Sequence, residues 1–273
     1  MVRGGGFKMS VWSGVLLKAL RDPAYRDIDL DSIEEARFQA QVMQKKIPVR
    51  EFYARAYRTL VELRVKYRVD PVGMEVEIGS GGGFFKSVRP QAVTTDIRRI
   101  DGVDETLDAC DMHLKDGSVA VIYSLFCIHH IPRIRDFFKE ALRVLEPGGL
   151  IVAIDPYWSP LGALFFRYFC SEPYAPDAKR WEFDGQGPMS CSNQALSYIL
   201  LKRDRALFEA EFPRLRVVHQ EPLASLDYLC AGALWGRQFF PTSVCRLAGK
   251  LEERSGPLKR LVSVFHSFVY RKQ

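Results

Sequence analysis

The strongest constraint on the fold is a set of apolar segments that alternate with helical segments along the middle of the chain. Residues 119–126 (VAVIYSLF) and 150–155 (LIVAID) are continuous apolar runs, which indicates strands buried on both faces of a sheet. Between them, residues 135–145 (RDFFKEALRVL) have the apolar spacing of an amphipathic helix that ends at the Pro-Gly-Gly sequence 147–149. Strands that alternate with helices predict a parallel sheet with right-handed crossovers and helices on both faces.

The flanking segments extend this pattern in both directions. Upstream, residues 74–78 (MEVEI) and 91–97 (QAVTTDI) read as strands. Downstream, the segment 214–220 and the β-branched and aromatic segment 261–273 read as two further strands. Helical spacing predicts the remaining elements at 32–46, where Ser32 and Glu35 form a capping-box pattern, at 51–67 beyond Pro48, and at 194–212.

The chain of 273 residues is long enough for one large domain with additions. We expect an N-terminal helical cap over 1–70 and a main domain over 71–273. Two segments interrupt the alternation and read as insertions, at about 156–193 and 221–262. The predicted fold class is therefore α/β, with a doubly wound, mostly parallel sheet, a helical cap and two insertions.

Composition excludes several classes of protein. The 47% hydrophobic and 26% charged residues are those of a soluble globular protein, and no apolar run approaches the roughly 18 residues that span a bilayer. The excess of 39 basic over 33 acidic residues is mild and spread along the chain, so no nucleic-acid partner is expected. Lys18 interrupts the short apolar N-terminal stretch, so no secretory signal is expected. The six cysteines are scattered, with no C-x-x-C pair and no metal-ligand spacing of histidines. They predict reduced thiols in a cytosolic compartment and no metal site.

A glycine cluster follows the strand expected at 74–78, in the sequence VEIGSGGGFF. Glycines gather where side chains are excluded, which fits either a tight turn or a loop against which a ligand lies. The dinucleotide pattern G-x-G-x-x-G fails because Phe84 occupies its last position, and the Gly-Lys-Ser/Thr of a P-loop is absent. The shorter pattern G-x-G-x-G fits residues 79–83.

Four motifs then agree in order and spacing with a known family. VEIGSGGG, VTTDI, LDACDMHLKDGSVAVIYSLFCIHHIP and FFKEALRVLEPGGLIVAIDP, over about 74–157, resemble the class I S-adenosylmethionine-dependent methyltransferases. This resemblance implies a Rossmann-like sheet of seven strands and S-adenosylmethionine as cofactor. The segments SEPYAPDAKRWEF and GPMSCSNQALSYIL look like a subgroup of such enzymes found with polysaccharide-building glycosyltransferases.

The resemblance also implies roles for individual residues at the cofactor. The loop would approach the methionine half and Glu77 its amino group; the carboxylate of Asp96 would accept the ribose hydroxyls. The implied cofactor-binding set is Glu77, Gly79, Ser80, Gly81, Asp96, Ile97, Asp108, Ala109, Ser124 and Leu125, with the Asp-Ala pair at the adenine and the last two near the sulfonium. The chain departs from the family at Leu107, where glycine is usual, and at Ala120, where an acidic residue is usual.

The implied reaction is methyl transfer to an oxygen or nitrogen of an acceptor, either a small molecule or a glycan, including a lipid-linked glycan. An activated sulfonium needs alignment more than it needs catalytic groups, although a hydroxyl acceptor can require a base. The candidate bases are His129, Asp155, Tyr157 and Glu172. Structural roles compete with these assignments, since the histidines at 129 and 130 can simply hold a loop by hydrogen bonds.

The two insertions are expected to roof the crevice at the carboxyl edge of the sheet. In 221–262, basic residues such as Arg237, Arg246 and Lys250 interleave with Trp235, Phe239 and Phe240, as in helices on anionic membrane surfaces. The alternative is that these residues pack against the sheet. The expected location is cytoplasmic, with a peripheral contact at the inner membrane surface as a further hypothesis. Two other functions stay open, an inactive cofactor-binding scaffold in a biosynthetic complex and a nicotinamide-dependent oxidoreductase.

Overall fold

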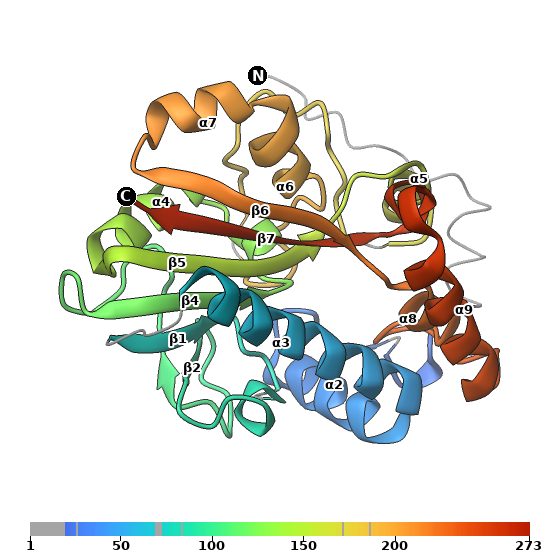
Figure 1. The fold of residues 1–273 in the computed structure, drawn as a ribbon. Helices are drawn as coiled ribbons and strands as arrows, with labels where there is room; N and C mark the ends of the chain where they lie inside the picture. The colour runs from blue at the N-terminus through green and yellow to red at the C-terminus, as the bar shows by residue number, and fades with distance from the viewer. Residues whose placement is uncertain (1–19, 26, 69–72, 83, 171, 186) are drawn as a thin grey trace, which may run out of the picture.

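The computed structural model describes residues 20–25, 27–68, 73–82, 84–170, 172–185 and 187–273. Its centre is one seven-stranded sheet with the order β3-β2-β1-β4-β5-β7-β6 (Figure 1). β7 runs antiparallel to β5 and β6, and the other paired strands are parallel. The strands are β1 (Met74–Ile78), β2 (Val93–Asp96), β3 (Glu105–Thr106), β4 (Val119–Leu125), β5 (Leu145–Pro156), β6 (Leu215–Leu223) and β7 (Phe265–Lys272). The predicted α/β fold with a mostly parallel, seven-stranded sheet is confirmed.

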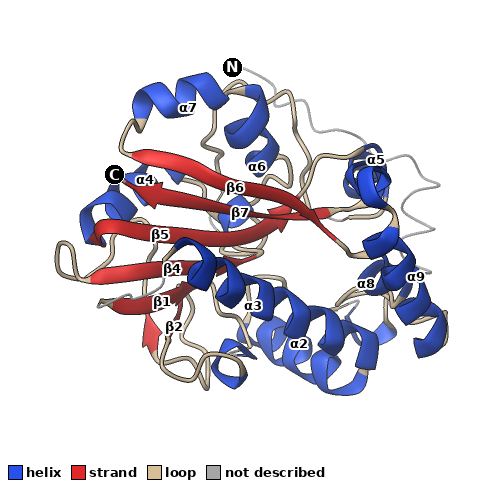
Figure 2. Ribbon diagram, in the orientation of Figure 1, coloured by secondary structure: helices blue, strands red, loops and turns tan. Residues whose placement is uncertain are grey.

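Helices cover both faces of this sheet (Figure 2). The α-helices are α2 (Ile33–Lys45), α3 (Ile47–Tyr67), α4 (Ile134–Val144), α5 (Pro160–Tyr168), α6 (Leu196–Tyr198), α7 (Arg205–Glu211), α8 (Leu226–Cys230), α9 (Thr242–Arg254) and α10 (Lys259–Val262). Short 3-10 turns lie at Pro23–Tyr25, Phe84–Ser87, Ile128–His130 and Gly256–Leu258, and a π-helical segment at Ile199–Arg203.

Each face of the sheet has its own hydrophobic core. On one face, Phe52 and Leu60 of α3 pack with side chains such as Val152 of β5. On the other face, Phe137 and Phe138 of α4 pack with residues of α6, α7 and the sheet. Both phenylalanines are completely buried, and burial of each such ring contributes about 1.5–3 kcal/mol. Burial on both faces explains why β4 is apolar throughout.

The N-terminal helices follow local sequence signals. Ser32 caps α2, where its Oγ accepts a hydrogen bond from the backbone NH of Glu35 at 3.3 Å. α3 begins four residues earlier than the helix expected at 51–67, because Pro48 occupies its first turn instead of breaking it. No helix of the described ranges has both the length and the apolar character needed to span a membrane.

Two other segments differ from the sequence-based expectation. β5 begins at Leu145, before the Pro-Gly-Gly sequence that was expected to separate helix from strand. Its pairing with β4 jumps from Val119↔Leu145 to Val121↔Leu150, so a bulge takes up the extra residues, with Gly148 at φ 74°. The helix expected at 194–212 is divided into α6, the π-helical segment and α7.

The strand order places a crevice between β1 and β4. The chain proceeds outward from β1 through β2 to β3, and then returns to the other side of β1 at β4. In open α/β sheets ligands bind outside the carboxyl ends of the strands at such a reversal point. The loops that follow β1, β2 and β4 therefore define where a site is expected.

Candidate active site

A cavity of about 450 Å³ lies at this reversal point. The loops after β1, β2 and β4 form one wall, represented by Gly79, Asp96 and Phe126. The segments expected to be insertions form much of the opposite wall, including Phe165, Glu172 and Met189 from 156–193 and Tyr228 and Trp235 from 221–262. The cavity thus joins residues that lie far apart in the chain.

The glycine loop has a conformation that favours glycine. Gly79 and Gly81 both have positive φ, at 65° and 51°, where side chains are rarely tolerated. A Cβ on Gly79 would also lie 2.4 Å from Sγ of Cys127. A hydrogen bond to the neighbouring strand β2 also holds the loop, since the Ser80 NH donates to the Thr95 carbonyl at 2.9 Å. Gly83, the last glycine of the predicted pattern, lies outside the described residues.

Glu77 lies directly behind this loop, in the last part of β1. Its carboxylate is 1% exposed, and its Oε2 accepts a hydrogen bond from the Ser80 hydroxyl. The other oxygen, Oε1, has no hydrogen-bond partner among the described residues. Burial raises the pKa of Glu77 to about 7. The glutamate itself is not among the described residues that line the cavity, whereas its neighbour Ile78 is.

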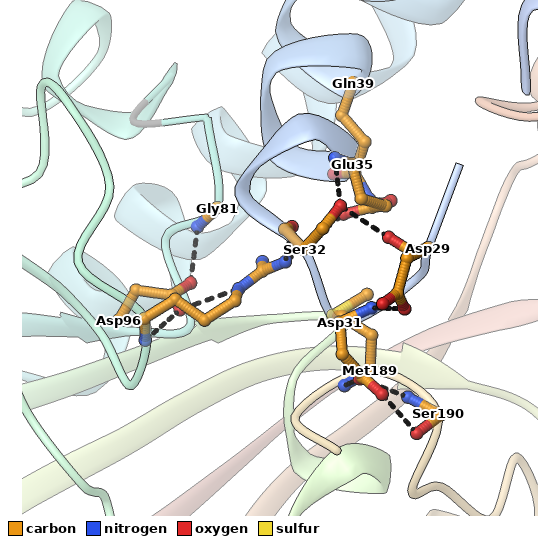
Figure 3. A network of polar contacts seen from close by, with 10 residues as sticks. Asp29, Asp31, Ser32, Glu35, Gln39, Gly81, Asp96, Met189 and Ser190 are labelled. Carbon is orange, nitrogen blue, oxygen red and sulfur yellow. Dashed lines mark hydrogen bonds and ion pairs between the residues drawn. The ribbon is translucent and has the colours of Figure 1, made fainter. Parts of the chain in front are cut away.

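Asp96 ends β2 and faces the cavity beside the glycine loop (Figure 3). Its Oδ2 accepts a hydrogen bond from the Gly81 NH at 3.0 Å. Its Oδ1 accepts from the NH of Arg98 at 2.9 Å and from Nε of the same residue at 3.3 Å. Since a carboxylate has about four acceptor positions, Oδ2 retains capacity for a further donor.

Arg98 connects this carboxylate to the N-terminal segment, a link that sequence reasoning missed. Its Nη1 donates to the Ser32 carbonyl at 3.2 Å and lies 3.4 Å from Oε2 of the buried Glu35. Nearby, Oδ1 of Asp31 accepts from the NH groups of Met189 and Ser190 at 2.8 and 2.9 Å (Figure 3). The start of α2 therefore joins the cofactor-side wall to the segment around residue 189.

The remaining expected cofactor residues divide into two groups. Ile97, Asp108, Ala109 and Leu125 line the cavity. Asp108 is already bound on both oxygens, by the Cys110 NH at 2.8 Å and by Nη2 of Arg133 at 3.0 Å. Ser124 is completely buried behind the wall, with an Oγ that has no hydrogen-bond partner in the described part of the chain.

The turn after β4 carries backbone strain. Phe126 has φ 57°, a left-handed conformation that is unusual for an aromatic residue. Its ring lies 4.4 Å from that of Phe265, between centroids, and also packs on Phe52. Strained residues of this kind gather at functional sites, where the surrounding packing holds them. Packing of Phe126 against Phe265 and Phe52 thus fixes the backbone at the point where the segment 127–130 begins.

A polar cluster also lines the cavity. Nδ1 of His129 lies 2.6 Å from Oδ1 of Asp155, which also accepts a hydrogen bond at Oδ2 from the Ser197 hydroxyl at 2.6 Å. Nε2 of His129 and Nε2 of His130 each lie 3.5 Å from Oε2 of Glu172. Both histidines and Glu172 line the cavity, and Asp155 lies behind His129.

The charges in this cluster depend on one another. Burial disfavours the imidazolium of His129, but the carboxylates of Asp155 and Glu172 raise its pKa to about 9. Burial and the charge of His129 lower the pKa of His130 to about 4. Burial opposes ionisation of Glu172, yet the two imidazoles lower its pKa to about 2. At neutral pH the imidazolium of His129 therefore lies between the side chains of Asp155 and Glu172.

The structure thus brings together three of the four candidate bases. Tyr157 is not among the described residues that line the cavity, and its ring packs on His266 at 5.2 Å between centroids. From the sequence, His130 is only the neighbour of the candidate base His129, and the structure places it in the cluster. The adjacent histidines are visible in the sequence, whereas no motif near Arg98 indicates that its side chain contacts the start of α2.

The residues present fit an S-adenosylmethionine molecule. The backbone of the glycine loop lies open to the cavity, and Asp96 retains acceptor capacity beside it. Oε1 of Glu77 and Oγ of Ser124 are buried polar atoms that lack partners in the described residues, at the ends of adjacent strands. Neither residue lines the cavity, so the fit rests on the glycine loop and on Asp96.

Comparisons with known proteins agree with this fold. Residues 76–153 match the family described as "Methyltransferase domain". A chain of the complex between the Haloferax volcanii Trm112 methyltransferase activator and a protein assigned as a methyltransferase is 15% identical, with a TM-score of 0.51 over 89% of this chain and 97% of that one. At this identity the likeness is one of fold.

Two further solved structures have lower scores. Geranyl diphosphate C-methyltransferase from Streptomyces coelicolor A3(2), crystallised with S-adenosyl-L-homocysteine, is 13% identical with a TM-score of 0.47, over 97% of this chain and 99% of that one. An S-adenosylmethionine-dependent methyltransferase from Mesorhizobium loti is 16% identical with a TM-score of 0.43, over 80% and 96%.

Proposed function

Since this chain carries a class I S-adenosylmethionine-dependent methyltransferase domain, we propose that it transfers the methyl group to an oxygen or nitrogen of an acceptor bound at the His129–Glu172 end of the cavity. The observation that carries this proposal is the arrangement of the cavity itself. The glycine loop, Asp96 and the polar cluster with His129 and Glu172 all line this one cavity.

In this proposal the cofactor occupies the side formed by β1, β2 and the segment 107–110. Gly79, Ser80 and Gly81 would receive the methionine half, and Oε1 of Glu77 would accept from its amino group.

Asp96 would accept a ribose hydroxyl at Oδ2, next to the Gly81 NH that it already binds. The adenine-side residues would be Ile97, Asp108 and Ala109, with Ser124 and Leu125 nearest the sulfonium. Bound cofactor supplies an activated methyl group, and the protein aligns it with the acceptor.

The acceptor end would handle the proton that a hydroxyl or ammonium group must lose. Asp155 orients His129, and Glu172 is the carboxylate of this cluster that reaches the cavity. The carboxylate of Glu172 would accept a hydrogen bond from the acceptor group and take up its proton as the methyl group is transferred. Tyr157 has no part in this scheme, because it is not among the described residues that line the cavity and its ring packs on His266.

The class of acceptor follows from the walls of the cavity and from the surface beside it. Aromatic side chains from both insertions, including Phe165, Tyr228 and Trp235, suit a glycan or another ligand with apolar faces.

We propose that 1–70 acts as a cap on a main domain at 71–273, since the start of α2 is bound to both Asp96 and residue 189 through Arg98 and Asp31.

α9 adds a proposed contact with a membrane surface. Val244, Leu247 and Leu251 lie at helical spacing on its exposed side, each more than 40% exposed, and Lys250 and Arg254 are exposed beside them. The flanking exposed apolar residues are Phe239, Phe240, Leu258 and Leu261. Contiguous apolar surface flanked by basic residues is typical of helices that lie on anionic lipid. This contact would bring the cavity to a lipid-linked acceptor.

Calorimetry with S-adenosylmethionine, S-adenosylhomocysteine and NADH tests the proposal. We expect both adenosyl ligands to bind and NADH not to bind. Release of S-adenosylhomocysteine in the presence of sugar or lipid-linked glycan acceptors then distinguishes an enzyme from a scaffold. Binding without turnover on any hydroxyl or amine acceptor would favour the scaffold, and binding of NADH alone would favour an oxidoreductase.

A further inference from the structure

The residues His129, His130 and Glu172 have the composition and spacing of a metal-binding site. One potential ligand atom from each residue lies within 4.8 Å of the other two. Nε2 of each histidine lies 3.5 Å from Oε2 of Glu172. In a tetrahedral zinc site with metal–ligand bonds of about 2.0–2.1 Å, neighbouring ligand atoms are about 3.4 Å apart. Both separations are close to that geometry.

A second, independent feature is the hydrogen bond behind His129. Nδ1 lies 2.6 Å from Oδ1 of Asp155, and Oδ2 of Asp155 is held by the Ser197 hydroxyl. This bond directs the other ring nitrogen, Nε2, toward Glu172. Histidine ligands of metals usually donate their second ring NH to such a carboxylate, which fixes the orientation of the ring. The side-chain amide of Gln194 orients Glu172 by donating to Oε2, the same oxygen that faces the two histidines.

We infer that His129, His130 and Glu172 bind one divalent first-row transition metal ion at the acceptor end of the cavity. Two imidazoles and one carboxylate select such an ion over Mg²⁺ and Ca²⁺, which prefer oxygen ligands. Because the three side chains line the cavity, an ion bound to them would lie at the cavity wall and would keep a coordination position for a ligand. It suits an oxygen ligand, and on the proposed function this would be the acceptor hydroxyl.

The competing explanation is an ion-pair cluster that needs no metal. The imidazolium of His129 between Asp155 and Glu172 already pairs the charges. That account explains His129 but gives no reason for the second buried histidine, His130, at the same distance from the same carboxylate oxygen. Three converging ligand atoms with an outer carboxylate are explained together by a metal ion.

The test is equilibrium dialysis of the full chain, first stripped with a chelator, against Zn²⁺, followed by elemental analysis. We expect one Zn²⁺ per chain, and no binding of Mg²⁺ at the same concentration. Glu172→Gln and His130→Asn should each weaken Zn²⁺ binding by at least tenfold, and Asp155→Asn by about 10- to 100-fold through loss of the outer hydrogen bond. Thermal unfolding with excess Zn²⁺ should shift upward in the wild type and not in Glu172→Gln.

The control is His113→Asn, which removes an exposed histidine outside the cluster and should bind Zn²⁺ as the wild type does. All six cysteines remain in every variant, so binding that is lost in Glu172→Gln is not thiolate binding. Circular dichroism in chelator identifies variants that have unfolded. Absence of Zn²⁺ binding in the wild type, or equal binding by the wild type, Glu172→Gln and His130→Asn when all are folded, would overturn the inference. Calorimetry with S-adenosylmethionine is independent of this result, so the proposed function is judged separately.

Discussion

The backbone NH of Gly81 donates to Oδ2 of Asp96 at 3.0 Å, which joins the glycine loop after β1 to the end of β2. The loop is thus held in its positive-φ conformation by the carboxylate that is proposed to bind the ribose. Arg98 binds the other oxygen of Asp96 and continues to Ser32 at the start of α2. A change at Asp96 is therefore expected to affect both the glycine loop and the contact with the start of α2.

Asp96→Ala should weaken S-adenosylmethionine binding by roughly ten- to several-hundred-fold. Hydrogen bonds to a charged acceptor contribute about 1.5–3 kcal/mol each, and water replaces part of the loss. Calorimetry measures the dissociation constant, and circular dichroism checks the fold. Asp101→Ala is the matched control, because Asp101 is an exposed aspartate whose ion pair with Arg37 lies on the surface. An unchanged dissociation constant in folded Asp96→Ala would remove Asp96 from the site.

Gly81→Val should abolish cofactor binding while circular dichroism stays largely native. A Cβ at Gly81 would meet only Oε1 of Gln39 among the described atoms, at 3.8 Å, so the side chain would enter the cavity without a clash in the protein. The backbone cost of φ 51° is present as well. Gly117→Val is the control, since Gly117 has φ 63° and open space around it away from the cavity. Normal binding by Gly81→Val would mean that the loop is only a turn.

Gly79→Ala should destabilise the protein by the clash with Cys127. The new Cβ would lie 2.4 Å from Sγ and 2.7 Å from Cβ of Cys127. Removing only the sulfur therefore should not restore stability, so Gly79→Ala combined with Cys127→Ala stays destabilised. Combination with Cys127→Gly should recover part of the loss, leaving the cost of about 1–2 kcal/mol for alanine at positive φ. Urea unfolding compares the variants, and equal rescue by both partners would contradict this geometry.

Glu77 should make stability depend on pH between about 4.5 and 7. Its folded pKa is raised to about 7, so the folded state holds a proton that the unfolded state has lost. Stability from this group is fully present below about pH 4.5 and falls as pH rises through 7, by a total on the order of 3 kcal/mol. This decrease in the free energy of unfolding should be absent in Glu77→Gln. The difference in free energy of unfolding between the two proteins should therefore change with pH. Urea unfolding at pH 5, 6, 7 and 8 measures it, and parallel pH profiles would contradict the prediction.

Cosedimentation with anionic liposomes tests the proposed membrane contact of α9. We expect the wild type to bind at low salt and more weakly at moderate salt, because Lys250 and Arg254 lie in water and are screened. Replacing Val244, Leu247 and Leu251 together with Asn should reduce binding at least tenfold without loss of stability. Leu207→Asn, at an exposed leucine of α7, is the control. Absence of binding in both salts would favour a soluble acceptor. Trp235 is left unchanged in this test, because it lines the cavity.

Several features of the fold could be predicted because they depend on local sequence. Buried runs such as 119–126 identify central strands, since a strand covered on both faces must be apolar throughout. The cap at Ser32 is a short-range hydrogen bond that its pattern predicts. Element boundaries were less certain where tertiary pairing overrode local signals, as at Leu145, where pairing with Val119 begins β5 before the glycines.

The sequence by itself determined the alternation of the main strands with helices, the glycine loop and the carboxylate at the end of β2, because each depends on contiguous residues. It did not predict β3 or the helices α5, α8, α9 and α10. Tertiary structure alone decided that Glu172, 42 residues beyond His130, shares one cluster with both histidines, and that Arg98 binds the start of α2. It also decided that Tyr157 lies outside the cavity and that Trp235 lies in its wall. Local sequence patterns indicate secondary structure and burial. The contacts that make up a site form between side chains from distant segments, and only tertiary packing decides which of these lie together.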